Sequence, residues 1–427
     1  LNVMKNIFYI IPLLFLFINC SKNSFEENPV EKVWKDPNKE MEKLKEELLN
    51  QDNGWEFKLE DGLTKAIFFG HINFDSDTDI SFLTDYSKSY YKKNKGKIIF
   101  SIKNNKPTFH FPKTTRFAQL LEHSRNLDSL YILNRIDNDT IFFDGHQIGT
   151  KFKLFKSTNE RKQALVSNNI EKNRKDLIKT FEMKKYFFYL KKGEHTFDIK
   201  LDTFRKEFII NHGTNTDFKL FISKYYFDHD GIVLNKTFNV NGVEIKKLKP
   251  KNIQADFAEF EDGITITNES KPKIYDLSIT KDFHGHIVGF GWGSYAGFGT
   301  RDKRDIANIR AMPELNVHAI FPTLIIQEDA ERLHGMIVFI NRAGGFMLGA
   351  ELQLTSYTED GRVVFTKYVI EDDPKNPLLM ASKAILTPIL YNKEGFYIIR
   401  NGAGVDLVDA RDALTWGNYV PVMRKQD

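Results

Sequence analysis

The sequence has only one cysteine, Cys20, in 427 residues, so it can form neither an internal disulfide nor a zinc site built on clustered thiolates. An excess of one charge is also missing, because 61 Lys and Arg residues are set against 57 Asp and Glu residues, for a net charge of +4. Such a balance gives no indication of nucleic-acid binding. The most apolar run, Ile7 to Ile18, is shorter than the roughly 20 residues that a membrane-spanning helix needs.

The N-terminus has the layout of a secretory signal: Lys5, then the apolar run, then Asn19 and Cys20. The segment "LFINC" (16 to 20) resembles a bacterial lipobox, with Asn19 where Gly or Ala is commonest. The resemblance implies that residues 1–19 are a lipoprotein signal peptide. The Cys20 thiol would receive diacylglycerol, and its freed amine would be acylated, for instance with palmitate. Two acyl chains are enough for stable anchoring. The alternatives are a secreted protein with a chance cysteine, or an uncleaved anchor.

Residues 20–36 read "CSKNSFEENPVEKVWKD", a polar stretch that contains a proline and suits a flexible tether. The body follows, and we divide it into a β-rich domain with helices at 37–250 and a C-terminal β domain at 251–427. Beyond 251 the helical periodicity fades, glycines become denser and short strand-like runs such as "GITIT", "HGMIVFI" and "RVVFTKYVI" recur. This part is expected to be a barrel or a sandwich.

Aromatic residues dominate the body, with 37 phenylalanines and 16 tyrosines in the chain. They fall in alternating runs such as "KIIFSIKNNKPTFHF" (97 to 111) and "TIFFDGHQIGTKFKLF" (140 to 155). Alternation at period two, broken by Asn, Asp and Gly, predicts antiparallel strands joined by tight turns. The predicted fold class is α+β and predominantly antiparallel β, with two or three helices in the N-terminal domain and an all-β C-terminal domain.

Helices are expected at three places. In "DPNKEMEKLKEELLN", Asp36 can cap the N-terminus, Pro37 fits the first helical position, and an apolar stripe follows at Met41, Leu44 and Leu48. A second helix is expected from "STNE", where Ser157 and Glu160 have capping-box spacing. A short third helix is expected at 115–123.

Three segments together resemble one family: "DPNKEMEKLKEELLNQDNGWEFKLEDG", "DNDTIFFDGHQIGTKFKLFKSTNERKQAL" and "DGIVLNKTFNVNGVEIKKLKPKN". They are similar to a group of Bacteroidetes outer-membrane lipoproteins with a domain of unknown function, commonly encoded near SusC/SusD-type uptake systems. The resemblance covers about residues 30 to 250. It implies a lipoprotein of the outer membrane, facing the cell surface, and it supplies no catalytic residues. Glu26 and Glu27 weakly resemble the acidic surface-export signal of Bacteroidetes lipoproteins.

Two weak metal candidates stand out. His284 and His286 in "DFHGHIV" alternate, so that on a strand both imidazoles would face one side, but no third ligand lies nearby in the sequence. Asp75, Asp77 and Asp79 alternate like the start of a calcium loop, yet Ile80 and Tyr86 stand where the EF-hand pattern needs Gly and Glu. A polar hairpin turn is the alternative for the three aspartates. No metal and no cofactor are therefore expected.

The segment "GFGWGSYAGFGTRDKRD" (289 to 305) has the most unusual composition of the body. Its glycines and aromatics alternate, so one strand face could present Phe290, Trp292, Tyr295 and Phe298 as a flat binding or docking surface. The alternative is that these rings fill the core while the glycines admit a neighbouring strand. A dinucleotide fingerprint is excluded because no βαβ unit follows.

No Gly-x-Ser-x-Gly elbow or other catalytic motif is found, and Glu371, Asp372 and Asp373 precede a proline in a loop-like run. The sequence therefore favours a non-enzymatic outer-membrane lipoprotein. It would be an accessory subunit of a SusC/SusD-type or other TonB-dependent assembly. A surface protein that binds glycans or peptides is the second hypothesis, and a hydrolase is the third.

Overall fold

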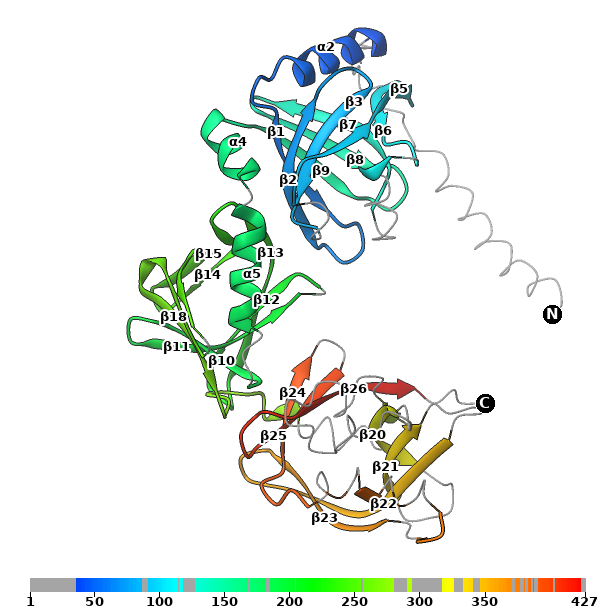
Figure 1. Ribbon diagram of the computed structural model, residues 1–427, viewed down its shortest axis with the longest axis vertical. Coiled ribbons are helices and arrows are strands. Elements are labelled where there is room, and N and C mark those ends of the chain that lie inside the picture. The colour runs from blue at the N-terminus through cyan, green and yellow to red at the C-terminus, as the bar shows by residue number, and fades with distance from the viewer. Residues whose placement is uncertain are drawn as a thin grey trace, which may run out of the picture.

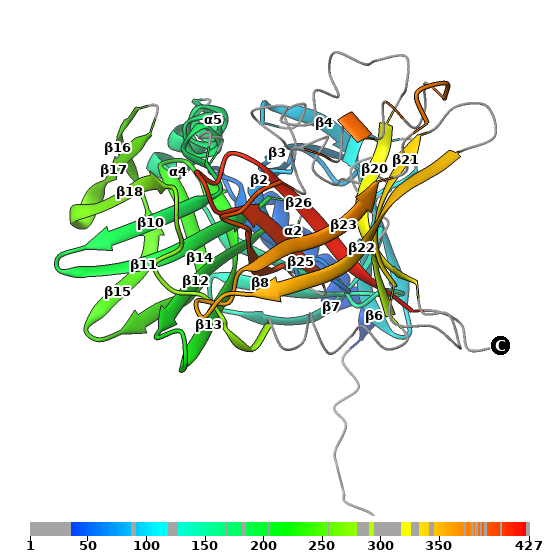
Figure 2. The ribbon, with the colours of Figure 1, turned by 90° about the horizontal axis from the view of Figure 1, so that it is seen from below.

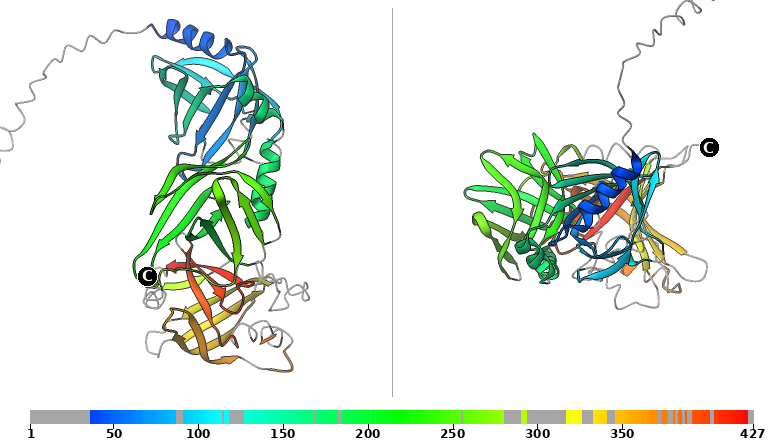
Figure 3. Two further views of the ribbon diagram at one scale, coloured as in Figure 1. Left: turned by 90° about the vertical axis from the view of Figure 1, so that its left-hand side faces the viewer. Right: turned by 90° about the horizontal axis from the view of Figure 1, so that it is seen from above.

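The computed structural model describes residues 36–86, 91–113, 115–117, 127–167, 169–181, 185–203, 205–254, 256–279, 290–293, 317–325, 333–340, 346–370, 373–376, 380, 383–384, 387, 391–401 and 404–423. The body is predominantly antiparallel β, as the alternating aromatic runs predict. The strands form three sheets that follow one another along the longest axis of the molecule, with α2 at one end and the third sheet at the other (Figures 1 and 3).

The first sheet has nine strands and is preceded by α2 (Pro37–Leu49). Its strands are β1 (Trp55–Glu60), β2 (Ile67–Phe74), β3 (Asp79–Thr84), β4 (Asn94–Lys97), β5 (Ile99–Lys103), β6 (Lys106–His110), β7 (Leu130–Asp137), β8 (Thr140–Gly145) and β9 (Lys151–Lys156).

The second sheet also has nine strands and is preceded by α4 (Asn159–Val166) and α5 (Asn169–Phe181). Its elements are β10 (Phe187–Lys192), β11 (His195–Asp202), β12 (Glu207–Gly213), β13 (Phe218–Asp228), β14 (Gly231–Val240), β15 (Val243–Leu248), β16 (Pro250–Ile253), β17 (Phe257–Phe260), the 3-10 turn η2 (Glu261–Gly263) and β18 (Ile264–Glu269). Figure 2 shows α5 nearly end-on beside β16–β18.

The third sheet has eight described strands. They are β19 (Phe290–Gly293), β20 (Val317–Ile325), β21 (Leu333–Ile340), β22 (Phe346–Tyr357), β23 (Val363–Ile370), β24 (Phe396–Asn401), β25 (Gly404–Asp409) and β26 (Trp416–Met423).

All three sheets share one connectivity: the chain runs up and down, and the first strand pairs with the last. β1 pairs with β9, β10 with β18 and β19 with β26, each antiparallel. The ladder is interrupted once in each sheet, between β4 and β5, between β15 and β16, and between β19 and β20. The body therefore repeats one topology three times, although the sequence shows no obvious repeat.

The expected domain boundary at 250 and 251 falls within β16, a strand of the second sheet. The reason is the long-range pairing of β18, which runs along all of β10 from Phe187↔Glu269 to Lys192↔Ile264. The segment "GITIT" was assigned to the C-terminal domain by its spacing. The hydrogen bonds instead show that this segment belongs to β18, so the second sheet ends at Glu269.

The first helix forms as its sequence predicts. The Asp36 side chain accepts a hydrogen bond from Asn38 N at 2.9 Å, and Met41, Leu44 and Leu48 are buried. Trp55 Nε1 donates to Leu48 O, so the helix end is tied to β1. No helix among the described residues is long and apolar enough to cross a membrane.

The cap of the second helix differs from the prediction by one residue. Thr158, not Ser157, is the N-cap of α4, and its side chain accepts a hydrogen bond from Arg161 N. The Ser157 hydroxyl is instead directed to Thr158 O. The expected helix at 115–123 lies largely outside the described residues.

Aromatic side chains fill the first sheet's core. Trp55, Phe57, Phe109 and Phe152 are among its fully buried rings. Phe109 meets Phe143 edge to face with 4.7 Å between ring centroids, a geometry that adds to simple burial. The high phenylalanine content is thus explained by the core.

The first and second sheets share a core. Ile67, Phe69, Leu83 and Tyr91 come from the first sheet and its loops, yet they belong to the cluster built on α5 and the second sheet. A salt bridge between Arg161 of α4 and Glu56 of β1 lies beside this core, with Arg161 also bonded to Asp228 of β13. These hydrogen bonds raise the pKa of Arg161, so the link keeps its charge.

The loop between β8 and β9 is held by one buried carboxylate. Asp128 accepts hydrogen bonds from Gln147 N, Ile148 N and Thr150 N, at 2.6 to 3.2 Å. A methyl group on Gly145 would lie 2.1 Å from Asp128 Oδ2. The glycine is required because only a residue without a side chain lets the carboxylate reach the loop.

We expect Gly145→Ala to lower the free energy of unfolding by about 2 kcal/mol or more, because the buried Asp128 carboxylate must move away from its donors. The control is Gly96→Ala, whose added methyl would meet the Ile80 side chain at 3.0 Å and the Phe82 ring at 3.5 Å, and it should cost under about 1 kcal/mol. Urea denaturation of both variants measures the difference. Equal small losses would show that Asp128 does not depend on the glycine.

Candidate functional site

A cleft of about 380 Å³ lies where the second sheet meets the third. The second sheet supplies most of its wall, the segment after β18 supplies Pro272, Ile274, Tyr275 and Asp276, and the third sheet supplies Ile399, Arg400, Asp406 and Trp416. Its volume is within the range of small-molecule sites, which are concave and mostly apolar.

Two rows of side chains cross neighbouring strands of the second sheet at the cleft. Strand register places Lys200, Ile209 and Ile222 opposite one another on β11, β12 and β13. The same register aligns Asp198, Asn211 and Leu220 in the next row. All six residues line the cleft. Each row therefore carries a polar residue on β11 and an aliphatic residue on β13.

The aliphatic end of the rows is open to solvent. Leu220 is 44% exposed and Ile222 is 41% exposed, although most large apolar side chains of the described body are buried. Phe218, two residues earlier on β13, also lines the cleft. Residues at alternate positions share one face of a strand, so Phe218, Leu220 and Ile222 form one apolar stripe.

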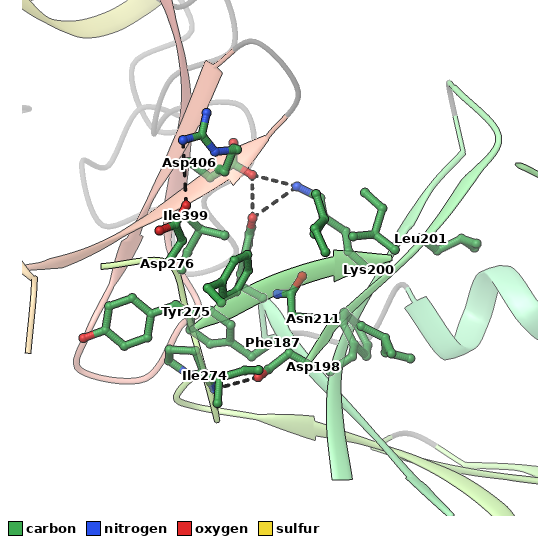
Figure 4. A pocket seen from close by; sticks show the side chains of 18 of the residues that line it. Phe187, Asp198, Lys200, Leu201, Asn211, Ile274, Tyr275, Asp276, Ile399 and Asp406 are labelled. Carbon is green, nitrogen blue, oxygen red and sulfur yellow. Dashed lines mark hydrogen bonds and ion pairs between the residues drawn. The ribbon is translucent and has the colours of Figure 1, made fainter. Parts of the chain in front are cut away.

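A polar cluster joins the two sheets across the cleft. Lys200 Nζ lies 3.0 Å from Asp406 Oδ2, and Tyr186 OH donates to the same oxygen at 2.6 Å. Lys200 Nζ also lies 3.2 Å from Tyr186 OH. Figure 4 shows Lys200 and Asp406 reaching toward each other from the two sheets. Since Asp406 is 1% exposed, the ion pair with Lys200 compensates a buried charge.

Asp198 fixes the segment that forms the cleft's third wall. Its carboxylate accepts hydrogen bonds from Lys273 N at 3.0 Å and Ile274 N at 2.7 Å, and Figure 4 shows it beside Ile274. Burial raises the pKa of Asp198 to about 6, although the two N–H donors act in the opposite direction. The side chain therefore changes protonation in a pH range where most carboxylates are fully charged.

This shift predicts a pH-dependent stability. The pKa of Asp198 is higher in the folded chain than its ordinary value of 3.8, so its contribution is fully present below pH 3.8 and is lost as the pH rises through about 6. The contribution is on the order of 2–3 kcal/mol. Between pH 5 and 7.5 the wild-type chain should lose about half of this contribution, and so should the exposed control Asp256→Asn, whereas Asp198→Asn should not show this loss. Denaturation curves of the wild-type chain and the two variants at pH 5 and 7.5 measure the free energy of unfolding. If Asp198→Asn shows the same difference between the two pH values as the wild type, Asp198 is not the group responsible.

Three acids of the cleft pair with cations, the fourth acid, Asp198, is held by backbone N–H groups, and one cation has no acidic partner in the described part of the chain. Asp406 pairs with Lys200, Asp276 lies 3.7 Å from Arg400, and Glu207 pairs with Lys224 at 2.8 Å. Lys185 lines the same cleft, and its ammonium forms no ion pair within the described part of the chain. The cleft thus combines apolar walls with an uncompensated positive charge.

A second cluster of potential ligands consists of Asp228, His229 and Asp230, whose ligand atoms lie within 4.8 Å of one another. Asp228 is bonded to Arg161 and His229, and Lys247 contacts Asp230. Burial alone would raise the pKa of Asp228, but the hydrogen bonds from His229 and Arg161 hold it well below its usual range. Two cations therefore occupy the position that a metal ion would take, and the cluster is an ion-pair network.

Asp75 and Asp77 lie in the turn between β2 and β3, and Asp79 is the first residue of β3. Asp79 pairs with Lys97 at 2.6 Å, and this hydrogen bond lowers the pKa of Asp79 to about 2. Ser81 Oγ donates to Asp75, and Asp75 N donates to Asp79 O. Asp77 joins no group of three possible metal ligands within the described residues. The geometry is that of the polar hairpin turn that the sequence offered as the alternative.

The remaining sequence candidates fall wholly or partly beyond the described residues. Cys20, His284, His286, Tyr295 and Phe298 lie outside them. Phe290 and Trp292 belong to β19, where Phe290 is opposite Met423 and Trp292 opposite Pro421 in β26. The described backbone shows that residues 290–293 of this segment form a paired strand.

Sequence reasoning missed the residues of the cleft. Asp198, Lys200 and Asp406 sit in ordinary alternating strands, and Tyr186 directly precedes β10. No motif surrounds any of them. Lys200 and Asp406 are 206 positions apart, so only the folded chain brings them together. The one local signal is the apolar stripe on β13, in the sequence "FKLFI".

The comparisons with known proteins identify no family for this chain. No family model matches the chain, and no curated protein matches it. Among solved structures, Helicobacter pylori beta clamp complexes align with 9–12% identity over 90% of this chain and 96–97% of theirs, at TM-scores of 0.13–0.17. A DNA polymerase III beta chain from Streptococcus pneumoniae aligns with 9% identity over 86% of this chain and 92% of its own, at a TM-score of 0.13. These similarities are too low to bear on fold or function.

Proposed function

We propose that this protein is a non-enzymatic lipoprotein of the outer membrane, facing the cell surface. It would bind a small ligand and serve as an accessory subunit of a SusC/SusD-type or other TonB-dependent uptake assembly. The observation that carries the binding role is the cleft between the second and third sheets. The lipobox-like segment that ends at Cys20 supports the anchor, and the sequence resemblance over residues 30 to 250 supports the partner.

The cleft's chemistry favours binding over catalysis. Its acids Asp406, Asp276 and Glu207 are each held by a cation, and Asp198 is held by two backbone N–H groups. A general base must be free to take a proton from substrate, and an acid fixed in an ion pair is poorly placed for that role. Apolar walls with a few fixed polar groups are typical of a ligand site.

The position of the cleft fits a tethered binding protein. The expected tether, residues 20–36, leads into α2 at one end of the body (Figure 1). The cleft lies away from that end, between the second and third sheets. The lipid end would thus lie at the membrane while the cleft extends away from it. Such an arrangement suits a protein that collects a ligand and delivers it to a membrane partner.

Purification from the native outer membrane tests the proposal. The tagged chain is extracted in mild detergent, and its co-purifying proteins are identified by mass spectrometry. The proposal expects a TonB-dependent barrel in near-equal amount. A Cys20→Ala chain is the matched control and should recover much less of it. Recovery of the lipoprotein alone, under conditions that keep other membrane complexes intact, would contradict the accessory role.

A further inference from the structure

The cleft between the second and third sheets has chemical features that narrow the class of its ligand. The apolar stripe Phe218, Leu220 and Ile222 runs along β13, and five residues of a strand extend over roughly 13 Å. Ile209 continues the apolar wall from β13 onto β12. A surface that is long, narrow and aliphatic matches an extended hydrocarbon chain better than a hydroxyl-rich sugar, whose polar groups would need partners along its whole length.

The polar end of the cleft carries two lysine ammonium groups, those of Lys185 and Lys200. The Lys200 ammonium can donate three hydrogen bonds. It donates one to Asp406 and one to Tyr186 OH, and it forms no further hydrogen bond in the described structure. Lys185 contributes a second ammonium that no acid of the described chain neutralises. Asp406, Asp276 and Glu207 each have a cation partner, and Asp198 is held by two backbone N–H groups. A negative group placed at the lysines therefore gains their attraction.

We propose that the cleft binds an amphipathic carboxylic acid of the fatty-acid type. Its aliphatic chain lies on Leu220, Ile222 and Ile209, and its carboxylate pairs with Lys185 and Lys200. This inference rests on the proposed ligand-binding function and adds to it the class of ligand. The charge-assisted pair selects acids, and the apolar stripe selects chain length.

Direct titration tests the proposal with two probes that differ only in the head group. The full chain carrying Cys20→Ala is used without detergent, and calorimetry measures the binding of sodium decanoate and of 1-decanol. We expect decanoate to bind one to one and decanol to bind at least tenfold more weakly. Absence of decanoate binding, or equal affinity for acid and alcohol, would overturn the proposal.

Three variants locate the site. Lys185→Gln should weaken decanoate binding about tenfold and leave decanol unchanged, because the ammonium acts on the carboxylate alone. Ile222→Asp should weaken both probes, since it places a charge on the apolar stripe. Lys191→Gln, on the exposed side of β10, is the control and should change neither. Melting curves of each variant confirm folding; an equal loss in Lys191→Gln would contradict the assigned site.

The two proposals fail independently. Lys185→Gln in the lipidated chain should still recover the membrane partner at wild-type level, because its effect is confined to the ligand. Partner recovery without decanoate binding would overturn the ligand class alone. Selective decanoate binding without partner recovery would overturn the accessory role alone.

Discussion

Replacement of Asp85 by Asn is expected to lower the free energy of unfolding by roughly 3–5 kcal/mol, the largest loss we predict for a single side chain. Asp85 Oδ2 lies 2.6 Å from Lys206 Nζ and also accepts a hydrogen bond from Phe227 N of the second sheet. Asp85 Oδ1 accepts from Phe69 N of the first sheet at 2.8 Å. One buried carboxylate thus bonds to both sheets.

The cost arises because the partner cation cannot reach water. Lys206 is 7% exposed, and burial lowers its pKa while the Asp85 carboxylate raises it. In Asp85→Asn the ammonium remains buried without its counter-charge, so the chain must lose a proton or open the interface between the sheets. The Phe68 ring, 4.7 Å from Lys206 Nζ, compensates only a small part of the lost attraction.

A double-mutant cycle isolates the ion pair. Lys206→Met combined with Asp85→Asn removes both charges, and the double variant should be more stable than Asp85→Asn alone. Urea denaturation followed by tryptophan fluorescence and by circular dichroism measures the four chains. A loss below about 1 kcal/mol in Asp85→Asn would show that the pair does not hold the two sheets together.

Replacement of Cys20 by Ala is expected to move the protein from the membrane fraction to the soluble fraction. Each buried methylene of an acyl chain contributes about 0.8 kcal/mol to membrane binding, so two chains anchor firmly and their loss is close to all or none. The apolar run from Ile7 to Ile18 is too short to replace the anchor by spanning the bilayer.

The experiment compares wild-type, Cys20→Ala and Ser21→Ala chains after cell fractionation, with radiolabelled palmitate in the growth medium. The label should enter the wild-type and Ser21→Ala proteins and be absent from Cys20→Ala. Firm membrane attachment of Cys20→Ala would contradict the lipid anchor. Label retained by Cys20→Ala would place the acyl chains at another residue.

The local structure of the body could largely be predicted from its sequence. Asp36, Pro37 and the stripe of Met41, Leu44 and Leu48 define α2, because caps and periodicity act over a few residues. The two asparagines at 104 and 105 form the tight turn between β5 and β6, and both have positive φ. Asparagine tolerates this conformation better than other residues that carry a side chain.

The long-range structure could not be predicted in the same way. Pairing of Trp55 in β1 with Lys156 in β9 joins the first and last strands of the first sheet, but neither strand carries a signal for a partner a hundred residues away. The same holds for β10 and β18, and because of this pairing the second sheet ends at Glu269 and not at the expected boundary. The cleft depends on such pairings, since its rows exist only through the register of β11, β12 and β13.

The central claim is that the protein is an accessory subunit of a membrane assembly. Chemical cross-linking in intact cells tests this claim most directly. Lys39 and Lys43 are exposed on α2, the end of the body that the expected tether joins to the lipid. An amine-reactive reagent should link these lysines to a TonB-dependent outer-membrane barrel, in the same cells that yield links within the chain. Abundant links within the chain, without any link to an outer-membrane barrel, would contradict the account.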